Sequence, residues 1–220
     1  MKKIFVFLLV LVLVISFSSL LEAKKKTYLV NMNLDQVTRQ PVLENEIKVV
    51  GGKSFTDELI QIQWTLTPED LKFELLNNSG DSLSLTWEEC FFIDKDKKRH
   101  RVLHSGIKPE KINNTMPPQV ITSKQKIKDM VYPGDYFFQK QKAEMGRGLD
   151  GSMSYAGTVL EWKKKPLFEK KVSLNEPGEF DFAGYKENLE KAVFEVILLL
   201  NAGEKKYEYS FYFKPEVKEK

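Results

Sequence analysis

Apolar and polar residues alternate along much of the chain, and this alternation predicts β-strands. In residues 71–75 leucine and phenylalanine alternate with lysine and glutamate, and residues 83–87 repeat the pattern. A period of two places the apolar side chains on one face of a strand. The turn-forming residues 77–81 lie between these segments, so the pattern predicts that the two strands pair as a hairpin.

The same signal marks further strands on both sides of this region. Residues 90–94 and 99–104 flank the charged turn 95–98 and predict a second pair of strands. Pro68 ends the segment 58–67, because proline has no N–H to donate within a sheet. The other predicted strands cover residues 28–33, 46–50, 120–122, 127–132, 135–138 and 158–163.

The C-terminal region predicts the clearest hairpin. Residues 192–200 form a nearly continuous apolar run, residues 201–205 have turn composition, and residues 207–213 alternate aromatic with polar side chains. The apolar run also fits a helical stripe, so periodicity alone leaves its first half open. The strict alternation after the turn favours two paired strands, with one helical turn near residues 186–190.

About a dozen short strands with turns between them, and no long helix, predict an all-β protein built as an antiparallel β-sandwich. Two regions interrupt the strand rhythm. Residues 106–119 contain three prolines and predict a connection that crosses between sheets, whereas residues 139–157 are rich in glycine and predict a long mobile loop. We find no internal repeat or interdomain linker, so residues 24–220 are expected to form a single domain with long loop insertions.

Residues 1–23 have the composition of a signal peptide. Two lysines precede an uncharged apolar run, residues 4–21, and Ala23 lies directly before three further lysines. This order directs a chain out of the cytoplasm, to the periplasm, the outer membrane or the medium, as a signal helix that is cleaved after Ala23. The apolar run has 18 residues, the lower limit for a spanning helix, so an uncleaved anchor is the alternative.

Composition limits the partners and the chemistry. The 34 basic and 31 acidic residues give a net charge of +3, which does not predict a nucleic-acid partner. Cys90 is the single cysteine, so the chain has no internal disulfide. Free cysteine is usually buried, and beside Phe91 and Phe92 we expect it to be a small buried apolar residue.

Two stretches resemble a known kind of protein. Residues 73–106, FELLNNSGDSLSLTWEECFFIDKDKKRHRVLHSG, and residues 117–133, PPQVITSKQKIKDMVYP, are similar to uncharacterised bacterial envelope proteins with an immunoglobulin-like sandwich. The resemblance implies an immunoglobulin-like fold and an extracytoplasmic location, and it implies no catalytic residue. Several of those proteins look like lipoproteins, whereas this chain lacks the lipid-accepting cysteine.

The two histidines, His100 and His104, lie four residues apart and close to Asp94 and Asp96. On a strand, residues at this spacing are roughly 13 Å apart. That separation is too long for both to bind one zinc ion at about 2 Å. A metal site at Asp94, His100 and His104 is therefore only a weak candidate, and exposed or partly satisfied imidazoles in a hairpin are the favoured interpretation.

Basic residues cluster at positions 95–101, 163–165 and 170–171. One interpretation is attraction to anionic lipid or polysaccharide. The favoured one is a solvated turn with lysines that protect an edge strand, since the net charge is small and aspartates dilute the first cluster. The chain has no glycine-rich phosphate loop and no G-x-S-x-G elbow, so no catalytic residue and no cofactor is predicted.

These observations favour a non-enzymatic, exported module with a binding or structural role in a bacterial envelope. Its partner would be an envelope protein or a glycan, bound by the loops at residues 106–119 and 139–157. The first alternative is a metal-dependent or acid–base enzyme centred on Asp94, His100 and His104. The second is a membrane-anchored envelope component held by residues 4–21.

Overall fold

The computed structural model describes residues 26–41, 47–147, 150–168, 171–174 and 182–219. The predicted signal peptide, residues 1–23, and the alternative anchor, residues 4–21, lie outside these ranges. Among the described residues, no helix is both long enough and apolar enough to cross a membrane.

Antiparallel strands dominate the described residues, which confirms the all-β prediction. The first strands are β1 (Lys26–Gln40), β2 (Ile47–Gly52), β3 (Ser54–Thr56), β4 (Ile60–Leu66), β5 (Leu71–Asn77), β6 (Leu83–Leu85), β7 (Phe91–Ile93) and β8 (Arg99–Leu103). They are followed by β9 (Gln119–Ile121), β10 (Lys126–Pro133), β11 (Phe137–Arg147), β12 (Met153–Lys164), β13 (Lys171–Leu174), α2 (Phe182–Lys191), β14 (Phe194–Ala202) and β15 (Lys205–Glu219).

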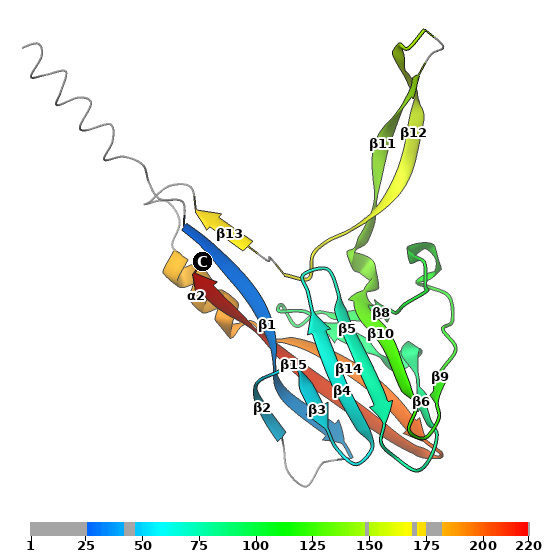
Figure 1. Cartoon of the computed structure of the whole chain (residues 1–220), viewed down its shortest axis with the longest axis vertical. Helices are drawn as coiled ribbons and strands as arrows, with labels where there is room; N and C mark the ends of the chain where they lie inside the picture. The colour runs from blue at the N-terminus through cyan, green and yellow to red at the C-terminus, as the bar shows by residue number, and fades with distance from the viewer. Residues whose placement is uncertain (1–25, 42–46, 148–149, 169–170, 175–181, 220) are drawn as a thin grey trace, which may run out of the picture.

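Thirteen of these strands form one sheet with the main order β13-β1-β15-β14-β7-β8-β10-β5-β4-β3. The sheet curls so far that its last strands lie over β1, β15 and β14 (Figure 1). Arg39 on β1 reaches across to Asp57 beside β4 at 2.8 Å, and the Tyr209 hydroxyl on β15 donates to the same carboxylate at 2.8 Å. These polar contacts link opposite layers of a nearly closed sheet.

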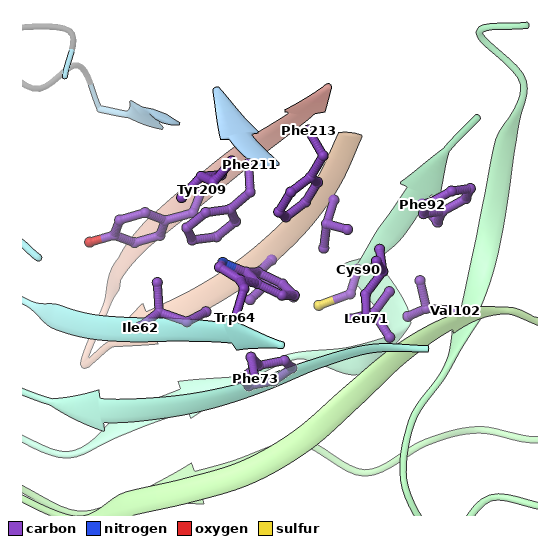
Figure 2. Packing of buried hydrophobic residues seen from close by; sticks show 14 of the residues in the cluster. Ile62, Trp64, Leu71, Phe73, Cys90, Phe92, Val102, Tyr209, Phe211 and Phe213 are labelled. Carbon is purple, nitrogen blue, oxygen red and sulfur yellow. The ribbon is translucent and has the colours of Figure 1, made fainter. Parts of the chain in front are cut away.

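An aromatic core fills the space between the layers (Figure 2). The ring of Trp64 on β4 lies 5.2 Å from Phe211 and 5.1 Å from Phe213, both on β15, and 5.3 Å from Phe73 on β5. All four side chains occupy apolar positions in strands whose apolar and polar residues alternate, and each is at most 2% exposed. The apolar side chains that recur at every second residue therefore do face the core.

The predicted hairpin between residues 71–75 and 83–87 is wrong. β5 pairs with β4 and β10, whereas β6 pairs with β14 and β9. The buried side chain of Asn77 donates to Asp81 O at 2.7 Å and to Ile121 O at 2.9 Å, and it accepts from Ser79 N. The turn is thus tied to β9, and the chain leaves β5 for another part of the sheet.

The other two strand pairs occur as predicted. β7 and β8 pair in the register Phe91↔Arg101, and β14 and β15 pair up to Ala202↔Lys205. Gly203 in the tight turn has a φ of 58°, a conformation that glycine adopts without steric cost.

Three local assignments need correction. Trp87 begins a 3₁₀ turn, η1 (Trp87–Glu89), and Asp135 lies in another, η3 (Gly134–Tyr136), where strands were predicted. The predicted helical turn at residues 186–190 is part of the ten-residue helix α2. The two 3₁₀ turns are short connectors of three residues each, too short to leave a periodic pattern in the sequence.

Candidate functional site

A long hairpin formed by β11 and β12 projects from the body of the molecule (Figure 1). Its strands have 11 and 12 residues and pair only with each other within the described structure. At about 3.3 Å per residue such an arm reaches roughly 35 Å. The prediction of a long mobile loop at residues 139–157 is therefore wrong, because most of this region is strand.

The alternation that marks the arm is present in the sequence, but it separates charged from uncharged residues. Residues 139–145 read QKQKAEM, so one face carries lysine and glutamate and the other carries glutamine, alanine and methionine. Since neither face lies in the core, the strand has little apolar content. That composition is why a search for buried strands misses it.

The strand register separates two chemically different faces of the arm. The pairs Lys140↔Glu161 and Lys142↔Val159 lie on the charged face. The other face, called the apolar face below, carries Met145, Met153, Tyr155, Leu160 and Trp162. Met145 pairs with Tyr155, whereas Arg147, Gln141 and Gln139 are the cross-strand partners of Met153, Leu160 and Trp162 on this face.

The apolar face is uncovered in the described structure. Met145 is 53% exposed, Leu160 58%, Met153 61% and Tyr155 64%. Single exposed apolar residues are normal on protein surfaces, whereas a contiguous patch of them marks an interaction site.

The base of the arm packs on the body. The Tyr132 ring lies 4.9 Å from the Phe137 ring, and Lys164 Nζ lies 2.7 Å from Asp70 Oδ1. At Gly134 a Cβ atom would lie only 1.6 Å from Ile112 Cδ1, so glycine allows this close packing. Ile112 belongs to residues 106–119, the predicted crossing connection, which thus packs against the arm's base.

The connection at residues 106–119 is fixed by polar contacts as well. It contains the short turn η2 (Pro109–Lys111), and Glu88 accepts a hydrogen bond from Met116 N. Arg101 donates to Glu88 at 2.5 Å and to Asn114 O at 3.0 Å. These bonds make the connection part of the folded body, with β8 before it and β9 after it.

His100 forms a bridge directly under the arm. Its Nε2 lies 2.9 Å from Asp94 Oδ2, and its Nδ1 lies 2.7 Å from Asp135 Oδ1 in η3, the turn that leads into β11. Lys98 Nζ is 3.2 Å from the same Asp135 carboxylate. The imidazole is 1% exposed, and the Tyr136 ring lies 5.2 Å away in an edge-to-face arrangement.

The structure brings together two of the three residues in the weak metal candidate and separates the third. His104 stacks on Trp87 at 4.2 Å, and its Nδ1 is 3.4 Å from Asp129 Oδ2. Asp94 and His100 instead meet Asp135, which sequence spacing did not indicate. Among the residues described, no group of three His, Cys, Asp or Glu side chains is placed to hold a metal ion.

Both carboxyl groups of the bridge have pKa values below their ordinary value of 3.8. Burial by itself would raise the pKa of Asp94, but hydrogen bonds from His100 and from the N–H groups of Lys98 and Asp96 outweigh it. For Asp135, burial is likewise outweighed by His100 and Lys98. The folded state thus favours the ionised carboxylates.

This shift predicts a loss of stability in acid. A lowered folded pKa contributes stability that is complete above the unfolded value near 3.8 and is lost as the pH falls through the lower folded value. We expect the free energy of unfolding in urea to fall as the pH drops below about 4. The variant Asp94→Asn should show a shallower fall, and equal slopes for both proteins would contradict the assignment.

The basic residues at positions 95–101 are mostly engaged with neighbouring side chains. Lys95 lies 2.9 Å from Asp96, and the Arg99 guanidinium lies 3.3 Å from the centre of the Phe91 ring. Lys163 in the arm likewise lies 2.8 Å from Glu161. These pairs support the interpretation as solvated turns more than a site for a polyanion.

Cys90 is buried, as predicted. Its side chain is 0% exposed, and Sγ donates to Thr86 O at 3.3 Å. Burial raises the pKa of the thiol to about 12, which keeps it protonated. The thiol therefore serves as a packing group of the core (Figure 2).

Comparison of the chain with protein-family models, with curated proteins and with solved structures found no match. The candidate site is therefore identified from geometry alone: the arm has a charged face, an apolar face and an anchored base.

Proposed function

We propose that this protein is an exported, non-enzymatic binding module that docks onto another envelope protein through the apolar face of its β11–β12 arm. The observation that carries the proposal is the uncovered apolar face, in which four side chains are more than half exposed. The immunoglobulin-like relationship and the extracytoplasmic location belong to the same proposal, supported by the strand pattern and by the composition of residues 1–23.

An isolated two-stranded ribbon is only marginally stable in water, and it gains stability when another layer covers its apolar face. Most of the arm lacks such a covering layer, because only its base packs on the body. A partner that covers the face would supply the missing layer at the usual spacing of about 10 Å between sheets.

Charge indicates the kind of surface that fits. Residues 137–164 contain five basic and three acidic residues, a net charge of +2. An apolar protein surface bordered by carboxylates complements this arm. A second copy of the chain fits less well, because two such arms repel each other.

The alternative of a metal-dependent or acid–base enzyme at Asp94, His100 and His104 has less support. The His100 imidazole is 1% exposed, and both of its nitrogens face carboxylates. A general acid or base must reach its substrate, directly or through one water molecule.

Site-specific photo-crosslinking in cells that produce the protein tests the proposal. With a photoreactive residue at Tyr155, we expect one discrete adduct with another protein. The substitution Leu160→Glu should weaken this adduct about tenfold, because it places a charge in an apolar, acid-bordered interface. Val159→Glu is the matched control, since Val159 is the neighbouring aliphatic residue on the charged face and is 37% exposed.

Three results would count against the proposal. The first is an adduct that contains only a second copy of the chain. The second is crosslinking to lipid alone. The third is an equal loss of the adduct in Leu160→Glu and Val159→Glu, since the two faces would then be equivalent.

A further inference from the structure

A second site lies near the base of the arm, between α2 and the segment that follows β12. It is a half-open cavity of about 460 Å³. This volume falls within the usual range of small-molecule sites, about 300–1,000 Å³. The cavity does not involve the apolar face of the arm.

The cavity has an apolar interior. Leu167, Phe168 and Phe194 line it and are 6%, 7% and 3% exposed, respectively. Leu189 of α2 also lines it, and so does Tyr136 from the turn at the base of the arm. An alkyl chain in this space would bury its surface against aromatic and aliphatic carbon, which is the main source of affinity for such a ligand.

The charged residues described in the cavity lining are all basic. Two lysines, Lys95 and Lys165, line the cavity, and no acidic side chain does so among the described residues. Lys165 has no ion pair with any residue that the structure describes, whereas Lys95 lies near Asp96. The nearby carboxylates of Asp94 and Asp135 are held by His100.

We infer that this cavity binds an amphipathic anion: one alkyl chain in the apolar interior, with a carboxylate or similar head group at Lys165. The arrangement matches small-molecule sites in general, in which an apolar lining gives affinity and a few polar groups fix orientation. The inference is independent of the proposed function, because the arm's apolar face plays no part in it.

Calorimetric titration of the purified protein with decanoate tests the site. We expect saturable binding with a Kd on the order of 100 µM, as befits a ligand of this size. Lys165→Glu should weaken binding about fivefold or more, because it replaces an attraction with a repulsion at the exposed mouth of the cavity. Lys163→Glu is the matched control, since this nearby lysine lies in the arm and does not line the cavity; it should leave the Kd unchanged.

A cationic ligand and two further variants test where decanoate binds. Nonyltrimethylammonium, which has the same alkyl chain as decanoate and the opposite charge, should bind more weakly than decanoate. Leu160→Glu on the arm should leave decanoate binding unchanged, while Leu189→Trp, which fills the cavity, should reduce it about tenfold. Thermal unfolding of each variant verifies that it is folded.

The inference is overturned by the absence of saturable decanoate binding up to about 1 mM. It is also overturned if Lys163→Glu and Lys165→Glu have equal effects, if Leu160→Glu abolishes binding, or if the cationic ligand binds as tightly as decanoate. Binding only to anionic vesicles, with none to monomeric decanoate, would likewise contradict a single-chain site.

Discussion

Replacement of Trp64 by alanine is expected to lower the free energy of unfolding by about 3–5 kcal/mol. Trp64 is 1% exposed and packs between β5 and β15, in edge-to-face contact with Phe211 and Phe213. The substitution removes apolar contacts from both layers of the curled sheet and leaves a cavity between them. Urea denaturation followed by far-ultraviolet circular dichroism measures the loss without relying on tryptophan fluorescence.

Trp162→Ala provides the matched control. Trp162 lies on the arm opposite Gln139, outside the buried cluster that contains Trp64. We expect its replacement to cost less than about 1 kcal/mol, since surface positions contribute little to stability. Equal losses for the two variants would mean that the arm is an integral part of the core, and the interpretation of the arm as a projecting binding element would fail.

Replacement of His100 by alanine is expected to cost about 3 kcal/mol at neutral pH. The change leaves Asp94, whose side chain is 10% exposed, without its partner in a poorly solvated place. Asp135 is 49% exposed and can regain water, which reduces the penalty at that end of the bridge. In a double-mutant cycle with Asp94→Asn, we expect most of this loss to appear as the coupling energy between His100 and Asp94.

The His100→Ala variant should also change the arm's attachment. Asp135 lies in η3, which immediately precedes β11, so the bridge fixes the turn from which the arm starts. We expect amide hydrogen exchange at Phe137 and Phe138 to accelerate more than exchange at β4 or β15. Uniform acceleration across the sheet would show that His100 supports global stability without a specific role at the arm.

Much of the strand content could be predicted because it follows from residue order alone. β15 and β5 bury every second residue, so their apolar period of two is visible in the sequence. Within the arm, the sequence predicted strand only at residues 135–138 and 158–163, next to its base. The outer part could not be found in this way, because its alternation separates charged from uncharged residues and both of its faces are exposed.

The candidate sites depended on the tertiary structure. Asp135 lies 35 residues from His100 in the chain, and only the packing of η3 against β8 brings the two together. The cavity under the arm likewise combines α2, η3 and the segment after β12, which no local motif connects.

The sequence by itself determined the class of fold and the burial of Cys90, since side-chain period and hydrophobicity are local properties of the chain. The tertiary structure alone decided strand pairing, the projection of the arm and the partners of His100. Asn77 shows the reason. Its side chain donates a hydrogen bond to Ile121 O on β9, 44 residues away, so the turn after β5 is held against β9. The turn composition had predicted instead that β5 pairs with the strand that follows it.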